Sequence, residues 1–166
     1  MSKLNASRTA QYPLTQEFVF NWNNFVVDSV DGTKKTLGST VALSTDPTDP
    51  ALNGPVANTV TFDCIPLPSG AVVTGGEVIV ETAYAGPTAA TVSLGVAGAL
   101  TALANAVDIK TAARTALTLT TPLVSNSVGQ NLRATIAYTV ANATAGKVRL
   151  RVQYTVDGRS QEVQAA

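Results

Sequence analysis

The chain has 166 residues, the size of one ordinary domain and enough to bury a substantial hydrophobic core. Hydrophobic residues make up 45% of it but charged residues only 13%, and 11 Lys and Arg balance 11 Asp and Glu. A net charge of zero excludes the basic footprint of a general nucleic-acid binder or of a protein that binds anionic membranes, so we expect neither partner.

The N-terminal stretch is polar and aperiodic. This pattern predicts an extended arm over residues 1–16, followed by a single β-sandwich domain over residues 17–166. Leu4, Tyr12 and Leu14 are isolated apolar residues in the arm, too few and too irregular to hold it against its own domain. We therefore predict that these three side chains bind a partner.

The first strand is predicted over residues 17–23, where Phe18, Phe20 and Trp22 share one face. A period of two is typical of a half-buried strand. Aromatic residues make up only 5% of the chain, and most stand at such core positions. A carbohydrate-binding module would instead need exposed aromatic rings on which sugars can stack.

The next segment is less regular. Residues 25–27 continue the apolar character, and Asp31-Gly32 is a tight-turn signal. Residues 41–43 could form a short return strand. Prolines and turn formers then predict a surface loop over residues 44–55.

Alternating apolar residues between turn formers predict six further strands. These cover residues 57–65, 71–84, 90–95, 115–120, 130–140 and 147–157. The single cysteine, Cys64, shares a strand face with Phe62 and Val60, which predicts a core position. A lone cysteine excludes an intramolecular disulfide and a cysteine-rich metal site, and no positive charge stands nearby to make this thiol reactive.

The last two predicted strands alternate most regularly, and we predict that they pair as a hairpin with one buried and one polar face. The apolar positions are Leu132, Ala134, Ile136, Tyr138 and Val140 in one strand and Val148, Leu150, Val152, Tyr154 and Val156 in the other. Lys147, Arg149 and Arg151 form a basic row on the polar face, with Arg133 beside them if the hairpin forms. This row is either a solvated strand face or a docking stripe for an acidic protein surface.

Two segments are irregular. Gly75-Gly76, inside a long predicted strand, indicates a bulge or bend that lets the strand turn a corner between sheets. Residues 96–113 carry Leu100, Leu103 and Val107 at helical spacing but also glycines and β-branched residues, so a loop with at most two turns of helix is expected. About eight strands then predict an all-β, two-sheet antiparallel sandwich, with a jelly roll as the leading topology.

The chain lacks the residues that most catalytic mechanisms need. The chain has no histidine, which excludes Ser-His-Asp and Cys-His machinery and histidine-dependent metal sites. Glu77 and Glu81 could serve a glycosidase, but four residues along a strand span about 13 Å, more than that reaction allows. The loop around Asp46 and Asp49 lacks the ligand pattern of a calcium loop. We therefore expect no enzyme activity, no cofactor and no metal.

The surface chemistry favours association. Few charges, no net charge and a mean hydropathy of +0.19 leave little to oppose contact between molecules, so neighbours are expected to cover much of the surface. The alternative is an ordinary monomer solvated by Ser and Thr. No segment is apolar enough to cross a bilayer and the start lacks the apolar stretch of a signal peptide, so we expect synthesis in a cytoplasm without an anchor.

Three segments resemble small virion structural proteins of tailed bacteriophages. They are residues 67–83 (LPSGAVVTGGEVIVETA), 114–120 (RTALTLT) and 145–159 (AGKVRLRVQYTVDGR), within a resemblance that covers roughly residues 65–159. The resemblance implies a structural part of the phage head or tail. Capsid decoration (cement) proteins are the functional class that it suggests first.

The leading hypothesis is therefore a capsid decoration protein. It would bind the major capsid protein on the outer shell as a homo-oligomer, namely a trimer. It would be made in the bacterial host cytoplasm and reside in the virion. A tail or head-tail connector component is the alternative. A carbohydrate-binding or adhesin module is a third reading, from a different class.

Overall fold

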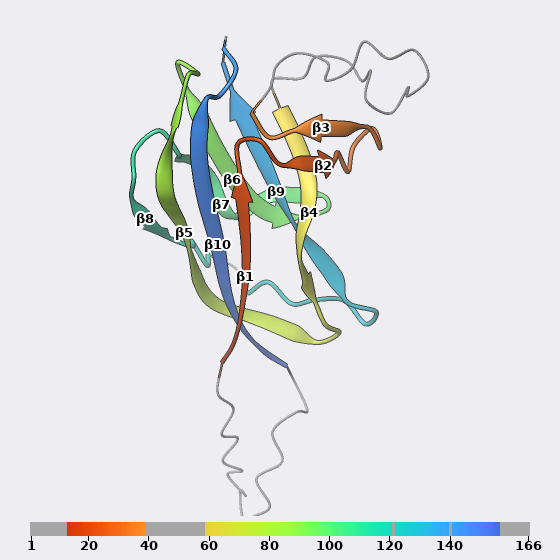
Figure 1. Ribbon diagram of the computed structural model, residues 1–166. Coiled ribbons are helices and arrows are strands. Elements are labelled where there is room, and N and C mark those ends of the chain that lie inside the picture. Colours follow the sequence, from red (N-terminus) through yellow and green to blue (C-terminus); the bar gives the residue numbers. More distant parts are fainter. Residues whose placement is uncertain (1–12, 39–58, 121, 140, 157–166) are drawn as a thin grey trace, which may run out of the picture.

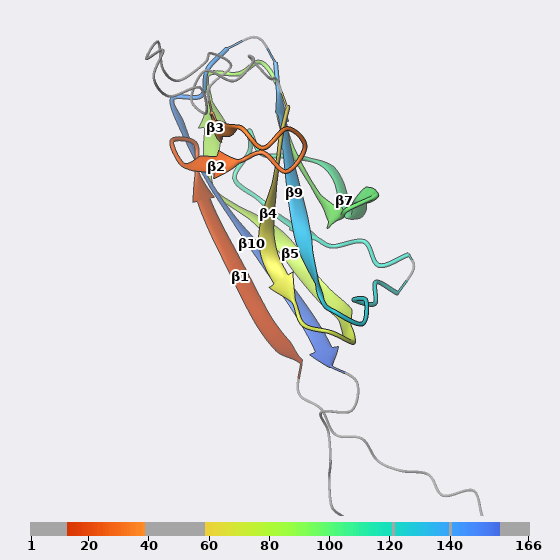
Figure 2. The same cartoon turned by 90° about the vertical axis from the view of Figure 1, so that its right-hand side faces the viewer.

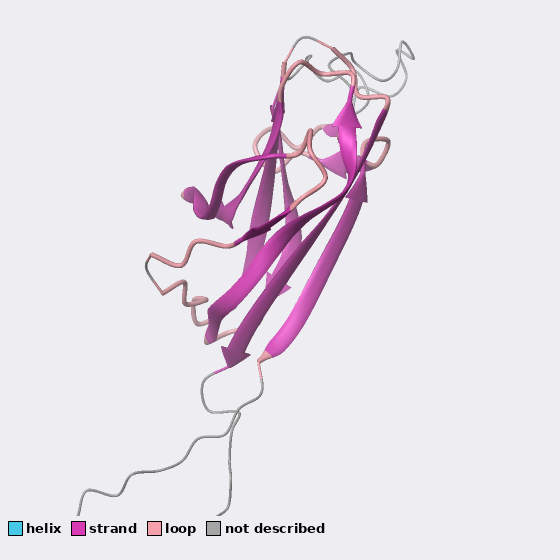
Figure 3. Cartoon of the chain, turned by 90° about the vertical axis from the view of Figure 1, so that its left-hand side faces the viewer, coloured by secondary structure: helices cyan, strands magenta, loops and turns pink. Residues whose placement is uncertain are grey.

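The computed structural model describes residues 13–38, 59–120, 122–139 and 141–156. Within these ranges the chain is all-β, as predicted, and forms ten strands and no helix (Figure 3). The strands are β1 (Leu14–Asn21), β2 (Phe25–Val27), β3 (Lys34–Thr36), β4 (Thr59–Leu67), β5 (Ala71–Ala85), β6 (Ala90–Val96), β7 (Ala99–Asp108), β8 (Arg114–Ala116), β9 (Gln130–Tyr138) and β10 (Ala145–Val156). None of the described segments is a helix long and apolar enough to span a membrane.

Two four-stranded antiparallel sheets make up the sandwich (Figures 1 and 2). One has the order β1-β10-β5-β8 and the other β4-β9-β6-β7, while β2 and β3 pair separately as a small hairpin. If β2 and β3 are left out, the other eight described strands can be renumbered 1 to 8 along the chain. In that numbering the two sheets have the strand orders 1-8-3-6 and 2-7-4-5. Every connection between consecutive strands of this set except β6–β7 crosses from one sheet to the other, which is the connectivity of a jelly-roll-like sandwich.

The core lies between the inner faces of the two sheets, and the alternation seen in the sequence builds it. Leu132, Ala134, Ile136 and Tyr138 of β9 are buried, as are Val148, Leu150, Val152 and Tyr154 of β10. Their neighbours along each strand point outward and are partly exposed. The predicted inward and outward faces are therefore confirmed for these residues.

The predicted pairing of these two strands is wrong. β10 lies between β1 and β5 in one sheet, whereas β9 lies between β4 and β6 in the other. Alternation decides which face of a strand is buried but does not decide its partner. The connection over residues 139–144 takes the chain from one sheet to the other, so Arg133 is not beside the basic row.

The segment over residues 96–113 is also not the loop that we predicted. Residues Ala99–Asp108 form β7, which returns from β6 through a turn in which Gly98 has a φ of 84°. The β6–β7 register shifts twice, and Leu103 and Ala104 are both buried although they are adjacent. Bulges of this kind break the period of two, which is why the apolar spacing resembled that of a helix.

The glycine pair in β5 does mark a bulge. The β10–β5 register slips between Gln153 and Tyr154, opposite Gly75 and Val73, so Thr74 is the extra residue. A Cβ on Gly76, whose φ is 146°, would lie 2.3 Å from the Arg151 carbonyl oxygen. The predicted corner between sheets is wrong, because both ladder partners of β5, β10 and β8, belong to one sheet.

Several predicted boundaries shift. β1 begins at Leu14, which pairs with Tyr154, so residues 14–16 belong to a strand and not to the arm. The predicted strand at 115–120 is reduced to β8 at Arg114–Ala116. The Asp31-Gly32 turn is confirmed, with β3 as its return strand. Leu4 and Tyr12, the predicted strand at 41–43 and the predicted loop at 44–55 lie outside the described residues.

Candidate functional site

The outer face of the β1-β10-β5-β8 sheet carries a connected set of ion pairs, here called the charge ladder. The ladder consists of Lys147, Arg149 and Arg151 of β10, Glu17 of β1, Glu77 and Glu81 of β5, and Arg114 of β8. The antiparallel register creates it, because Arg151 lies opposite Glu17 on one side and Glu77 on the other. The basic row is thus on an outer face, as predicted, but acidic residues flank it on both sides.

The contacts in the ladder are short and shared. Arg149 donates to Glu81 through Nε and to Glu17 through Nη1, both at 2.6 Å. Arg151 donates to Glu17 at 2.6 Å and to Glu77 at 3.0 Å. Four cations therefore face three carboxylates, which leaves only a small positive excess. A docking role for Lys147, Arg149 and Arg151 stays a prediction, and pairing within the ladder weakens their attraction for an acidic partner.

The ladder also bears on glycosidase chemistry. Hydrogen bonds from Arg114 lower the pKa of Glu77, and hydrogen bonds from Lys147 and Arg149 lower the pKa of Glu81. Arg149 and Arg151 lower the pKa of Glu17 in the same way. A glycosidase needs one carboxyl group with a raised pKa that can donate a proton. The pKa values of Glu17, Glu77 and Glu81 are instead lowered, so none of these three carboxylates is suited to donate that proton.

Acid should destabilise the fold through these carboxylates. Each glutamate has a folded pKa below its ordinary value of 4.5, so its contribution to stability is present above that pH and is lost as the pH falls through the folded pKa. We expect the Tm, followed by circular dichroism, to be flat near neutrality and to fall steadily below about pH 4.5. Glu17→Gln should make this fall shallower. A Tm that is constant down to about pH 3 would contradict the account.

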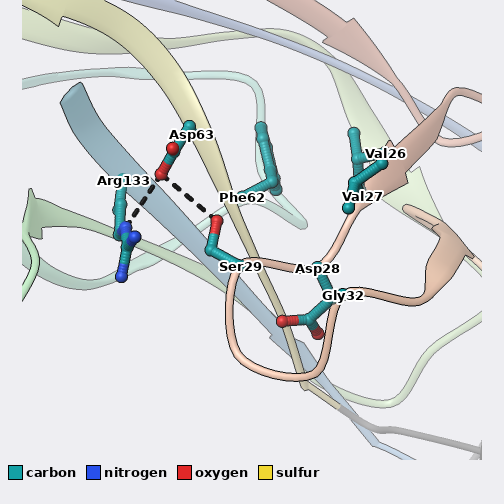
Figure 4. A pocket seen from close by; sticks show the side chains of 8 residues that line it. All are labelled: Val26, Val27, Asp28, Ser29, Gly32, Phe62, Asp63 and Arg133. Atoms are coloured by element: carbon teal, nitrogen blue, oxygen red, sulfur yellow. Dashed lines mark hydrogen bonds and ion pairs between the residues drawn. The ribbon is translucent and has the colours of Figure 1, made fainter.

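A second polar cluster joins the β2–β3 hairpin to the edge of β4. Asp28 is buried and accepts a hydrogen bond from Lys35 Nζ at 2.7 Å. Asp63 accepts hydrogen bonds from Arg133 at 2.8 Å and from Ser29 at 3.2 Å (Figure 4). The Ser29 amide also donates to the Thr61 carbonyl oxygen. The two bonds from Ser29 fix the hairpin against the neighbouring sheet, whereas the bond from Lys35 to Asp28 lies within the hairpin.

The hollow beside this cluster has a volume of about 520 Å³ and is lined by Val26, Val27 and Phe62 as well as the polar residues (Figure 4). Asp63 is already held by Arg133, Ser29 and Asn131. Among the described residues, no group of three or more His, Cys, Asp or Glu side chains could hold a metal ion. The loop with Asp46 and Asp49 lies outside those residues.

Cys64 is a core residue, as predicted. Its side chain is buried among the apolar residues of the sandwich, and its Sγ donates to the Leu132 carbonyl oxygen at 3.2 Å. Burial raises the pKa of the thiol to about 12. The thiol is therefore protonated at neutral pH and is not poised as a nucleophile.

Comparison with known proteins gives one informative similarity. No family model matches the chain, and no curated protein matches it. Among solved structures, it is similar to a chain of the cyanophage Pam1 capsid asymmetric unit, with a TM-score of 0.51 and 19% sequence identity. The superposition covers 93% of this chain and 94% of that chain. The similarity in fold therefore extends over nearly the whole of both chains.

Proposed function

We propose that this chain is a non-enzymatic structural protein of a bacteriophage virion. The observation that carries the proposal is the similarity in fold, over 93% of this chain, to a chain in a cyanophage capsid. The superposition also covers 94% of that chain, so the likeness in fold is not confined to one part of either chain. The low charge content of the sequence agrees with a role in assembly.

Within the virion, we propose that the chain is a decoration protein that binds the major capsid protein on the outer shell. It would do so as a homo-oligomer, namely a trimer. Such a protein needs a broad contact surface and no chemistry. A tail or head-tail connector component is the alternative role. Leu4, Tyr12 and Leu14 remain proposed partner-binding residues, although Leu14 is now placed at the start of β1.

The outer face of the β4-β9-β6-β7 sheet is the surface that best suits contact with the shell. Its outward positions in the three strands β4, β9 and β6 are mostly small and uncharged, and include Thr59, Thr91, Ser93, Thr135 and Ala137. Asp63 and Arg133 are the charged pair on this face. Covering such a face costs little desolvation, whereas covering the charge ladder would remove seven charged groups from water.

A charge placed on this neutral face should therefore weaken binding to particles. We expect Ala137→Lys to reduce co-sedimentation with particles that lack the chain by at least about tenfold, because the ammonium group would be buried against the shell. Gln153→Lys, at an exposed position of β10, is the matched control and should bind as the unmodified chain does. Both variants should keep the unmodified Tm.

The opposite pattern would reject this surface. If Gln153→Lys loses binding and Ala137→Lys keeps it, the ladder face contacts the shell. If the unmodified chain does not co-sediment with the particles at all, the decoration role itself is wrong.

A further inference from the structure

A second hollow lies at the end of the sandwich that carries the β2–β3 hairpin and the start of β10. It has a volume of about 600 Å³, within the range of small-ligand sites. Its lining includes Trp22, Asn23, Phe25, Thr36, Asn142 and Thr144. The described ends of the chain, at the start of β1 and the end of β10, lie at the opposite end of the sandwich (Figure 1).

The lining of this hollow is uncharged and partly aromatic. None of the residues that line the hollow has an ionisable side chain. Trp22 is the only tryptophan, and Phe25 is 63% exposed, which makes it an exception among the aromatic residues of the described chain. Neither ring packs against another aromatic ring in the described ranges, where the ring contacts join Phe18, Phe20 and Phe62. Aromatic side chains and uncharged polar side chains thus line the same hollow.

Backbone hydrogen bonds hold the walls of the hollow together. The Ala143 amide donates to the Gly38 carbonyl oxygen at 2.6 Å, and the Trp22 amide donates to the Gly146 carbonyl oxygen at 3.0 Å. Gly38 permits this close packing, because a Cβ there would lie 2.6 Å from the Trp22 carbonyl oxygen. A site whose walls are already fixed loses little entropy when a ligand binds.

We propose that this hollow binds a neutral sugar unit of a glycan. The apolar C–H face of the sugar ring would lie against Trp22 and Phe25, and its hydroxyl groups would exchange hydrogen bonds with amide and hydroxyl groups such as those of Asn23 and Thr144. An apolar ligand would leave these polar groups without partners, and an anionic ligand would find no cation in the lining. The inference is independent of the proposed virion role.

The single tryptophan makes the proposal directly testable, because all tryptophan emission comes from a residue that lines this hollow. The full chain is titrated with soluble neutral oligosaccharides of glucose, mannose, galactose and N-acetylglucosamine. At least one series should give a saturable change in fluorescence, with a Kd on the order of 1 mM or tighter. Phe25→Ala should weaken that binding by about tenfold, since it removes the most exposed ring surface.

Val27→Ala is the matched control, because Val27 is also exposed on β2, at 56%, but does not line this hollow. It should bind the same sugar with unchanged affinity, and Asn23→Ala should bind it more weakly. The proposal is overturned if no neutral series gives a saturable change, or if Phe25→Ala and Val27→Ala bind equally well. Tighter binding of a sulfated form of the same oligosaccharide would also overturn it, because the lining carries no positive charge.

Discussion

Replacing Phe62 with alanine is expected to lower the free energy of unfolding by about 3 to 5 kcal/mol, the usual cost of removing a buried aromatic ring. Phe62 is 1% exposed and stands on β4 in one sheet. Its ring centroid lies 5.9 Å from that of Phe18 and 5.7 Å from that of Phe20, both on β1 in the other sheet. The ring therefore joins the two layers of the sandwich.

Urea denaturation measures this loss, and Val30→Ala provides the control. Val30 is 77% exposed in the turn of the β2–β3 hairpin, so its truncation should change stability by less than about 0.5 kcal/mol. A double-mutant cycle of Phe20→Ala and Phe62→Ala should give a coupling of about 0.5 to 1.5 kcal/mol. A loss below about 1 kcal/mol for Phe62→Ala would contradict the packing of the two sheets.

Gly146→Ala is the second change with a large expected effect, about 2 to 4 kcal/mol of lost stability. Gly146 lies near the start of β10 with a φ of 150°, and a Cβ there would lie 2.3 Å from Cδ2 of Tyr84. Tyr84 is buried at 1% exposure and cannot move aside without disturbing the core. The new methyl group therefore adds a steric clash to backbone strain.

Gly32→Ala separates these two causes. Gly32 also has a positive φ, 74°, but nothing lies within 4 Å of a Cβ built there. This variant should lose only about 1 to 2 kcal/mol, from backbone strain alone. Equal losses for the two variants, measured by the same denaturation experiment, would mean that the Tyr84 contact does not matter.

The sequence predicts the burial pattern of this fold better than its connectivity. Leu132, Ile136, Val148 and Leu150 were correctly placed in the core, because a period of two depends only on the strand itself. Pairing depends on contacts between residues far apart in the chain. β9 and β10 are adjacent in sequence, yet they lie in different sheets, and no local signal in residues 139–144 distinguishes a crossover from a hairpin turn.

The charge ladder was predicted only in part. The outward position of Lys147, Arg149 and Arg151 followed from alternation, and Glu17 could have been placed outward by the same argument, since Phe18 and Phe20 point inward. What the sequence does not contain is the strand order that brings Glu17 and Glu77 to opposite sides of β10. Without the strand order, the acidic neighbours of the three basic residues are not visible, and the row looks like a surface that binds an acidic partner.

The exposed ring of Phe25 was also missed. Most aromatic residues do occupy the core, and Phe20, Phe62, Tyr84, Tyr138 and Tyr154 are all buried. In the short strand β2, however, Val26 packs against the core, so Phe25 and Val27 face outward. A three-residue strand has too few alternating positions to indicate its inward face from the sequence alone.

The central claim is that this chain is a structural part of a phage virion. Cryo-electron microscopy of the particles proposed to contain it, combined with its copy number per particle, tests that claim most directly. We predict hundreds of copies on the outer shell, grouped around local three-fold axes, with the face that carries Ala137 turned toward the major capsid protein. A handful of copies at the tail or the connector would support the alternative virion role. Absence of the chain from purified particles would contradict a structural role in the virion altogether.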